Sequence, residues 1–248
     1  MPLNIVFEDP WIIVIDKPPN LVAHPVSTLQ TGTLANGLQA YLDTQTPVRG
    51  LLRPGIVHRI DRMTSGLIVT TKSHLASREL GFDFEHRRVT KRYTAIVHGV
   101  LADDEGTIDL PIGQQFNSIL MSCGENVRRR KPAVTDYKVR QRLADRTIVD
   151  VMPRTGRNHQ IRVHFSAIGH PLIGDKFYGF EPPTGPSPGD SRHALHASLL
   201  GFNHPVLGVA MEFHSPLPPD LHNASSNAGV ASHSGRHDGL QFGTRESG

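Results

Sequence analysis

The chain contains one cysteine and no long apolar segment. Cys123 is the single cysteine among 248 residues, which excludes an internal disulfide framework and is typical of proteins from a reducing compartment. No run of about 18 apolar residues occurs, and the N-terminus lacks the basic start and apolar core of a signal peptide. We therefore expect a cytoplasmic protein that does not associate with membranes.

Sequence signals for metals and nucleotide cofactors are also scarce. The chain has 15 histidines, but it has no HExxH pair, no cysteine pair and no aspartate-rich loop, and His159 and His164 are five positions apart. No Gly-x-Gly-x-x-Gly or Walker loop follows a predicted strand. A phosphoesterase that uses clustered histidines would need a metal, so this alternative has weak support. We predict no metal and no cofactor.

The excess of positive charge is small and must be judged by where it gathers. The formal net charge is +3, and the isoelectric point is about 9.2. Basic residues cluster at Arg87-Arg88, at Lys91-Arg92 and at Arg128-Arg129-Arg130-Lys131. Such clusters are found on ordinary solvated surfaces as well as at nucleic-acid interfaces, so charge alone leaves both interpretations open.

Hydrophobic patterning predicts a mixed protein of strands and helices. The chain is long enough to bury a core, as one large domain or two small ones. Apolar or alternating segments predict strands at residues 4–9, 11–16, 89–97, 148–152, 195–202 and 211–213. Helical spacing predicts helices at 34–42 after Thr33, at 74–85 after Ser73, and at 158–168 with Asn158 as the cap.

Three segments lack such patterns. Residues 106–130 are rich in polar residues and glycine, so we expect a loop with short strands there. Residues 180–191 contain several prolines and glycines and are expected to form a mobile loop. Residues 223–248 have too little apolar content to offset the entropy of ordering, so we expect a disordered tail after a folded region of residues 1–222.

The most distinctive stretch is residues 56–71. Ile56-Val57 and Leu67 to Thr71 are β-branched and apolar, and the nine residues that end at Gly66 carry two arginines, a histidine, a carboxylate and two hydroxyls. This pattern predicts a strand, a charged loop and a second strand. A solvated connection would account for it, but loops held by rigid scaffolds are also where chemistry tends to occur.

The order of residues in this loop resembles a known family. His58-Arg59-Ile60-Asp61 followed by Thr64-Ser65-Gly66-Leu67 is closely similar to the catalytic motif of the RluA-type RNA pseudouridine synthases. Further matching blocks are Lys91 to Ala95, Thr155 to His164, Gly169 to Asp175, and Tyr178-Gly179. The resemblance extends from about Ile5 to Asp220. Many members carry an N-terminal S4 RNA-binding domain, and this chain begins directly with the catalytic region, so we expect RNA selection to depend on the cleft, its loops or the basic run at Arg128.

The resemblance implies an α+β fold and a specific reaction. The pseudouridine synthase fold is a largely antiparallel, mixed β-sheet flanked by helices, with a central RNA-binding cleft, and residues 1–222 would form this one catalytic domain. The reaction would isomerise specific uridines of rRNA or tRNA to pseudouridine. The partner would be RNA, and we expect the protein to be a monomer.

Three catalytic residues follow from the family's motifs. Asp61 would be the essential carboxylate, acting either as a nucleophile or as a base on the sugar. Tyr93 would stack on the uracil and help to remove the C5 proton, although its apolar neighbours on the predicted strand would also suit a core tyrosine. Arg162 is our candidate partner of Asp61, because the predicted helix presents it away from the apolar stripe and a nearby cation favours an ionised carboxylate.

Five further residues are predicted to contact RNA, namely Arg59, His58, Arg62, Arg157 and His159. The target base should be flipped out of the RNA, at a cost of a few kcal/mol, and by resemblance Arg59 would fill the vacated stack. The alternative is a non-catalytic RNA-binding or ribosome-assembly factor that retains the fold. The presence of Asp61, Tyr93 and Arg162 argues against it, because binding alone does not require that carboxylate.

Overall fold

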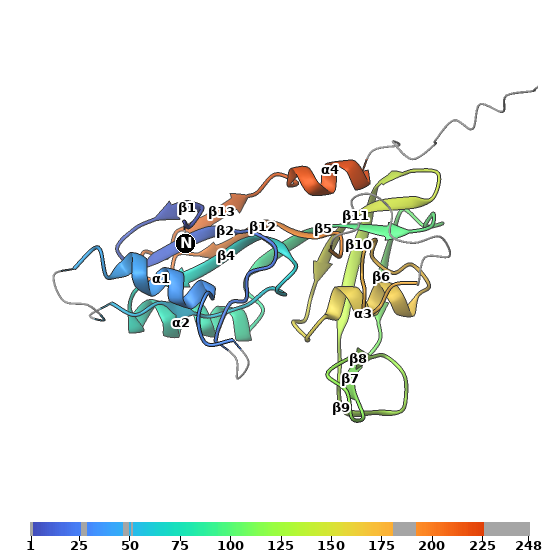
Figure 1. Cartoon of the computed structure of the whole chain (residues 1–248), viewed down its shortest axis with the longest axis horizontal. Coiled ribbons are helices and arrows are strands. Elements are labelled where there is room, and N and C mark those ends of the chain that lie inside the picture. The colour runs from blue at the N-terminus through green and yellow to red at the C-terminus, as the bar shows by residue number, and fades with distance from the viewer. Residues whose placement is uncertain (1, 26–28, 47–49, 51, 181–191, 226–248) are drawn as a thin grey trace, which may run out of the picture.

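The computed structural model describes residues 2–25, 29–46, 50, 52–180 and 192–225. Its main feature is a ten-stranded mixed sheet, in which eight strands form the path β1-β2-β4-β12-β5-β11-β10-β6 (Figure 1). The path strands are β1 (Ile5–Glu8), β2 (Ile12–Lys17), β4 (Ser65–Thr71), β5 (Thr90–His98), β6 (Glu105–Asp109), β10 (Val134–Arg142), β11 (Arg146–Pro153) and β12 (Leu195–Asn203). Two more strands, β3 (Gly55–Ile56) and β13 (Ala210–His214), pair with β4 and β12.

Strand β12 joins the two halves of the sheet. It pairs in parallel with β4 and antiparallel with β5 and β13, whereas the other strand pairs of this sheet are antiparallel. The N-terminal strands therefore lie on one side of β12 and the strands of the middle of the chain on the other (Figure 1). Together with the four helices found among the described residues, this arrangement confirms the α+β class.

Alternating residues of β2 pack against different helices on the two faces of the sheet. Ile13 and Ile15 share a core with the leucines of α1 (Leu34–Leu42), while Ile12 and Val14 share one with Leu80 of α2 (His74–Glu85). The Thr33 and Ser73 side chains accept hydrogen bonds from the backbone N–H groups of the first turns, so both predicted N-caps are confirmed.

Helix α3 (Gln160–Ala167) covers the same face of the sheet as α2, further along it. Ile161 and Phe165 of α3 pack on Ala95 and Val97 of β5. Side chains alternate along a strand, so the odd-numbered residues before Ala95 face the same side of the sheet. One of them, Val89, packs with the core under α2. The two helices flank a length of β5 that neither of them covers (Figure 1).

A small three-stranded sheet extends from the α3 side of the molecule (Figure 1). It consists of β7 (Ile112–Gln115), β8 (Met121–Ser122) and β9 (Val127–Lys131), and we call residues 112–131 the arm. The loop with short strands predicted for residues 106–130 is confirmed, and β6 is one of those strands. The basic run at Arg128 lies on β9, where four of the five residues are exposed.

One predicted element boundary, the start of the third helix, was wrong. The N-cap of α3 is His159, not Asn158, and it has left-handed backbone angles with φ of 55°. The reason is the Gln160 side chain, whose Oε1 accepts hydrogen bonds from the Arg157 N–H at 2.9 Å and the Thr155 hydroxyl at 2.7 Å, which closes the loop before the helix.

The C-terminal part of the described chain adds a helix that was not predicted. Helix α4 spans Pro219–Ser225 and passes the expected end of the folded region at residue 222. Residues 181–191 and 226–248 lie outside the described residues, and with them most of the predicted loop at 180–191 and most of the predicted tail. No helix in the described part of the chain is both long and apolar enough to cross a membrane.

Candidate functional site

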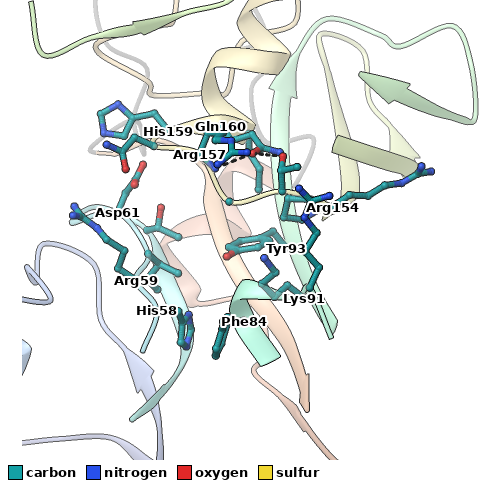
Figure 2. A pocket seen from close by; sticks show the side chains of 18 of the residues that line it. His58, Arg59, Asp61, Phe84, Lys91, Tyr93, Arg154, Arg157, His159 and Gln160 are labelled. Atoms are coloured by element: carbon teal, nitrogen blue, oxygen red, sulfur yellow. Dashed lines mark hydrogen bonds between the residues drawn. The ribbon is translucent and has the colours of Figure 1, made fainter. Parts of the chain in front are cut away.

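A cleft of about 550 Å³ lies between α2 and α3 over β5. One wall comes from the residue 57–64 segment and the end of α2, and the other from residues 153–162 (Figure 2). Its lining is strongly basic and includes Arg59, Arg87, Lys91, Arg154, Arg157 and Arg162. Asp61 and Glu85 are the carboxylates among the residues that line it. A basic cleft of this kind fits a polyanionic partner.

Asp61 lies in a turn that the backbone and a buried lysine hold in place. The Thr64 N–H donates to the Asp61 carbonyl at 3.0 Å, and Lys17 Nζ donates to the Arg62 carbonyl at 3.2 Å. Lys17 is fully buried and also donates to the carbonyls of Pro18 and Leu21. Burial lowers the pKa of Lys17 to about 7. The turn that carries Asp61 is therefore fixed by contacts to the core of the molecule.

Arg162 pairs with Asp61, as predicted. Arg162 Nη1 lies 3.0 Å from Asp61 Oδ2, and its side chain is 5% exposed whereas that of Asp61 is 23% exposed. Arg162 also donates through Nε and Nη2 to both oxygens of Asp175, at 2.7 and 2.8 Å. One buried guanidinium thus joins two carboxylates, of which Asp61 is the one that lines the cleft.

Tyr93 and Lys91 form part of the cleft floor on β5 (Figure 2). Tyr93 packs at the edge of the core that holds α3, so it is both a partly buried core residue and a cleft residue. Burial, followed by the charge of Asp61, raises the pKa of the Tyr93 phenol. Burial, followed by the charge of Arg87, lowers the pKa of Lys91. At neutral pH, Tyr93 therefore presents a neutral aromatic ring to the cleft.

His58 lines the cleft, but its ring is already engaged by the protein. The Val69 N–H of β4 donates to His58 Nε2 at 3.0 Å, and the ring stacks on Phe84 with centroids 4.3 Å apart. Burial, followed by the charge of Lys91, lowers the pKa of His58 to about 3. His58 is thus a neutral wall residue, and its predicted RNA contact stays a prediction.

The other predicted RNA-contacting residues differ in position. Arg59 is exposed and lines the cleft, and Arg157 lines the opposite wall while donating to the Pro132 carbonyl at 3.0 Å (Figure 2). His159 lines the cleft too, with its Nδ1 2.7 Å from the Tyr178 hydroxyl. Arg62 is not among the lining residues, and its Nε donates to Asn20 instead.

Sequence reasoning missed three residues that build this site. Asp175 ends the matching block that begins at Gly169, Gln160 lies inside the block from Thr155 to His164, and Lys17 directly follows the strand predicted at residues 11–16. All three are buried, and each acts through a polar contact: Asp175 with Arg162, Gln160 with the Arg157 N–H, and Lys17 with the Arg62 carbonyl. For Asp175 and Gln160, the available signal was their occurrence in blocks that match the family. Among the described residues, no group of three or more His, Cys, Asp or Glu could hold a metal ion.

Comparison with curated proteins and solved structures agrees with this geometry. The chain is 43% identical to an uncharacterized RNA pseudouridine synthase, YlyB, of Bacillus subtilis, over 89% of this chain and 71% of the relative. It is 38% identical to ribosomal large subunit pseudouridine synthase D of Escherichia coli K12, over 89% of this chain and 69% of the relative.

Similarity to solved structures covers the same region. The human RNA pseudouridylate synthase domain containing 4 matches with a TM-score of 0.73 and 25% identity, covering 90% of this chain and 93% of that one. A second human protein, RNA pseudouridylate synthase domain containing 1, matches with a TM-score of 0.67 and 28% identity, covering 87% of this chain and 83% of that one. A family model described as RNA pseudouridylate synthase matches residues 11–167, which include the Asp61 turn, Tyr93 and Arg162. The chain belongs to the RNA pseudouridine synthase family and is an isomerase that acts on RNA.

Proposed function

We propose that this enzyme converts specific uridines of ribosomal RNA to pseudouridine, with Asp61 as the essential carboxylate. The observation that carries the proposal is the state of Asp61, which is ion-paired with Arg162 yet partly open to a basic cleft. Ribosomal RNA is the favoured substrate because several relatives at about 40% identity bear the name ribosomal large subunit pseudouridine synthase D.

The reaction needs no net gain or loss of atoms. The C1′–N1 bond of uridine breaks, the uracil rotates, and C5 forms a bond to C1′, while C5 loses a proton and N1 gains one. A single carboxylate can assist by attacking covalently or by removing a proton from the sugar. Asp61 suits either role because Arg162 occupies one of its oxygens and the other is not hydrogen-bonded to a described residue.

Tyr93 suits a stacking role on the cleft floor. Its ring lines the same cleft as Asp61, so a uracil flipped into the cleft could stack on it (Figure 2). The raised pKa of the phenol keeps it protonated at neutral pH. Tyr93 could therefore take the C5 proton only if it passed its own proton to another acceptor at the same time.

Base flipping gives Arg59 a role at the cleft entrance. The glycosidic bond of a stacked uridine is shielded, so the base must leave the stack at a cost of a few kcal/mol. Arg59 is exposed beside Asp61 and its planar guanidinium can occupy the vacated space. Arg157 and Arg154 on the opposite wall can contact phosphates. A non-catalytic RNA-binding protein would gain nothing from a carboxylate in a basic cleft, so we do not favour that alternative.

The substrate can be tested by mapping pseudouridine at each position of rRNA and tRNA from cells with and without the protein. We expect loss of pseudouridine at one or a few positions of large-subunit rRNA, restored by the wild-type gene. Complementation with Asp104→Asn, which changes an exposed carboxylate paired with Arg142 far along the chain from the motif, should also restore them. Changes confined to tRNA, or no change at any position, would contradict the proposed substrate.

A further inference from the structure

The turn after α3 packs against Arg162 from two directions. Asp175 is fully buried and takes two of the guanidinium's donors, while the Tyr178 ring lies over its face with the centroid 4.9 Å from Cζ. The carboxylate of Asp175 also accepts from the backbone N–H groups of Phe177 and Tyr178, at 3.0 and 3.2 Å. One carboxylate therefore shapes the turn and holds the arginine.

This packing decides which donor of Arg162 faces Asp61. The Nε and Nη2 edge is occupied by Asp175, so the free direction is Nη1, which points at Asp61. If Asp175 were absent, the Arg162 guanidinium could turn and donate through Nε and Nη2 to both oxygens of Asp61. With Asp175 in place, Asp61 receives a single hydrogen bond and keeps its second oxygen for the substrate.

Tyr178 ties the same turn to two other parts of the site. Its hydroxyl accepts from the Met121 N–H of the arm at 3.0 Å and lies 2.7 Å from His159 Nδ1. Burial raises the pKa of Tyr178 and lowers that of His159, so this hydrogen bond joins a neutral phenol to a neutral imidazole at neutral pH. The Tyr178 carbonyl accepts from Ser166 of α3 at 2.8 Å. The turn is thus anchored to the arm, to the cleft wall and to the helix that carries Arg162.

We propose that Asp175 and Tyr178 are positioning residues for the isomerisation, which act by fixing the orientation of Arg162 toward Asp61. This inference rests on the proposed role of Asp61. It assigns no contact with RNA to either residue. Its consequence is that changes at Asp175 should reduce the rate of the chemical step and leave the affinity for RNA almost unchanged.

The test is a double-mutant cycle of Asp175→Asn and Arg162→Lys, measured as the single-turnover rate at saturating rRNA substrate. Asparagine keeps an acceptor for the turn but loses the charge. Lysine keeps the charge but lacks the planar fork through which Arg162 binds both oxygens of Asp175. We expect about a 10- to 100-fold loss of rate for Asp175→Asn, because a small misplacement of a catalytic group can have an effect of this size. The double variant should be no slower than Arg162→Lys alone.

Rates should be expressed per folded enzyme, with RNA affinity and the thermal midpoint measured beside them. If the rate loss of the double variant equals the product of the losses of the two single variants, Asp175 acts independently of Arg162. That result would overturn the inference. A wild-type rate for folded Asp175→Asn, or a loss confined to RNA affinity, would do the same. An inactive wild-type enzyme would instead refute the proposed function.

Two variants of Tyr178 and one control complete the design. Tyr178→Phe keeps the ring over Arg162 and should retain a rate within about threefold of wild type, while Tyr178→Leu removes the ring and should lose about tenfold. Equal rates for the two would overturn the role of the ring. Asp104→Asn is the control, because it removes a carboxylate from an exposed ion pair, and its rate should equal that of wild type.

Discussion

Two buried arginines of this molecule differ in what surrounds them. The side chains of Arg162 and Arg192 are 5% and 2% exposed, and each pairs with an aspartate at 2.7 Å. Arg162 donates to the carboxylates of Asp175 and Asp61, and Asp61 opens onto the cleft. Arg192 pairs with Asp220, whose side chain is 41% exposed on the surface.

The guanidinium of Arg192 also donates to backbone carbonyls and to a serine hydroxyl. Its guanidinium donates to the carbonyls of Met63 and Leu195 at 3.1 and 3.0 Å and to the Ser65 hydroxyl at 3.0 Å. These contacts join the end of the Asp61 loop to strand β12. A buried cation satisfied by backbone carbonyls supports the structure, whereas one shared by two carboxylates can tune a reactive group. The comparison predicts that the two arginines contribute to different measurable properties.

Replacement of each arginine by methionine should separate these properties. Arg162→Met should reduce the single-turnover rate by about 100-fold or more, because it removes the cation that pairs with Asp61. Arg192→Met should instead lower the free energy of unfolding by about 2–4 kcal/mol, because buried carbonyls lose their donor, while the rate per folded molecule changes little.

The readouts are single-turnover kinetics near neutral pH and denaturant unfolding of both variants. His159 and His193 also face Arg162, and burial lowers the pKa of each, to about 4 for His193. Both are therefore neutral where the rate is measured near neutral pH. A large rate loss in folded Arg192→Met, or a rate close to that of wild type in folded Arg162→Met, would remove the distinction between the two arginines.

A smaller effect is expected from the two histidines that stack on phenylalanines. His58 stacks on Phe84 in the cleft wall, and His86 stacks on Phe82 at the surface. The folded-state pKa of His58 is lowered from 6.5 to about 3, so the unfolded chain binds a proton that the folded chain does not. Its contribution to stability is present above pH 6.5 and is lost as the pH falls toward 3.

The expected slope is up to about 1.4 kcal/mol per pH unit for this one group. His58→Gln should reduce the acid dependence of the unfolding free energy by up to this amount, with little change in RNA affinity. His86→Gln is the matched control, because its ring is exposed, and it should keep the wild-type slope. A large fall in RNA affinity for His58→Gln would instead support the predicted RNA contact.

Much of the fold followed from local patterns in the sequence. The helix at residues 34–42 was predicted because Thr33 and an apolar stripe specify it locally, and the strand at 89–97 was predicted from alternation. The pairing of Arg162 with Asp61 was also predicted, because each residue lies in a specific motif. These features depend on neighbours in sequence or on short, distinctive patterns.

The missed features depend on contacts between distant segments. Asp175 becomes a partner of Arg162 only because the turn after α3 folds back on that helix. Lys17 is buried because three carbonyls, one of them from Arg62, accept from its ammonium group. His159 adopts left-handed backbone angles because Gln160 closes the preceding loop. Spacing and propensity carry no information about such tertiary hydrogen bonds.

The central claim is that Asp61 performs the chemistry, and release of tritium from C5 of labelled uridine in rRNA tests it most directly. Wild-type enzyme should release tritium with EDTA present and no added cofactor. Asp61→Asn should fold and bind the same RNA, because asparagine can still accept from Arg162, but its rate should fall below about a thousandth of wild type. Substantial release by the folded variant, or inhibition of wild type by EDTA that a divalent ion reverses, would contradict the account.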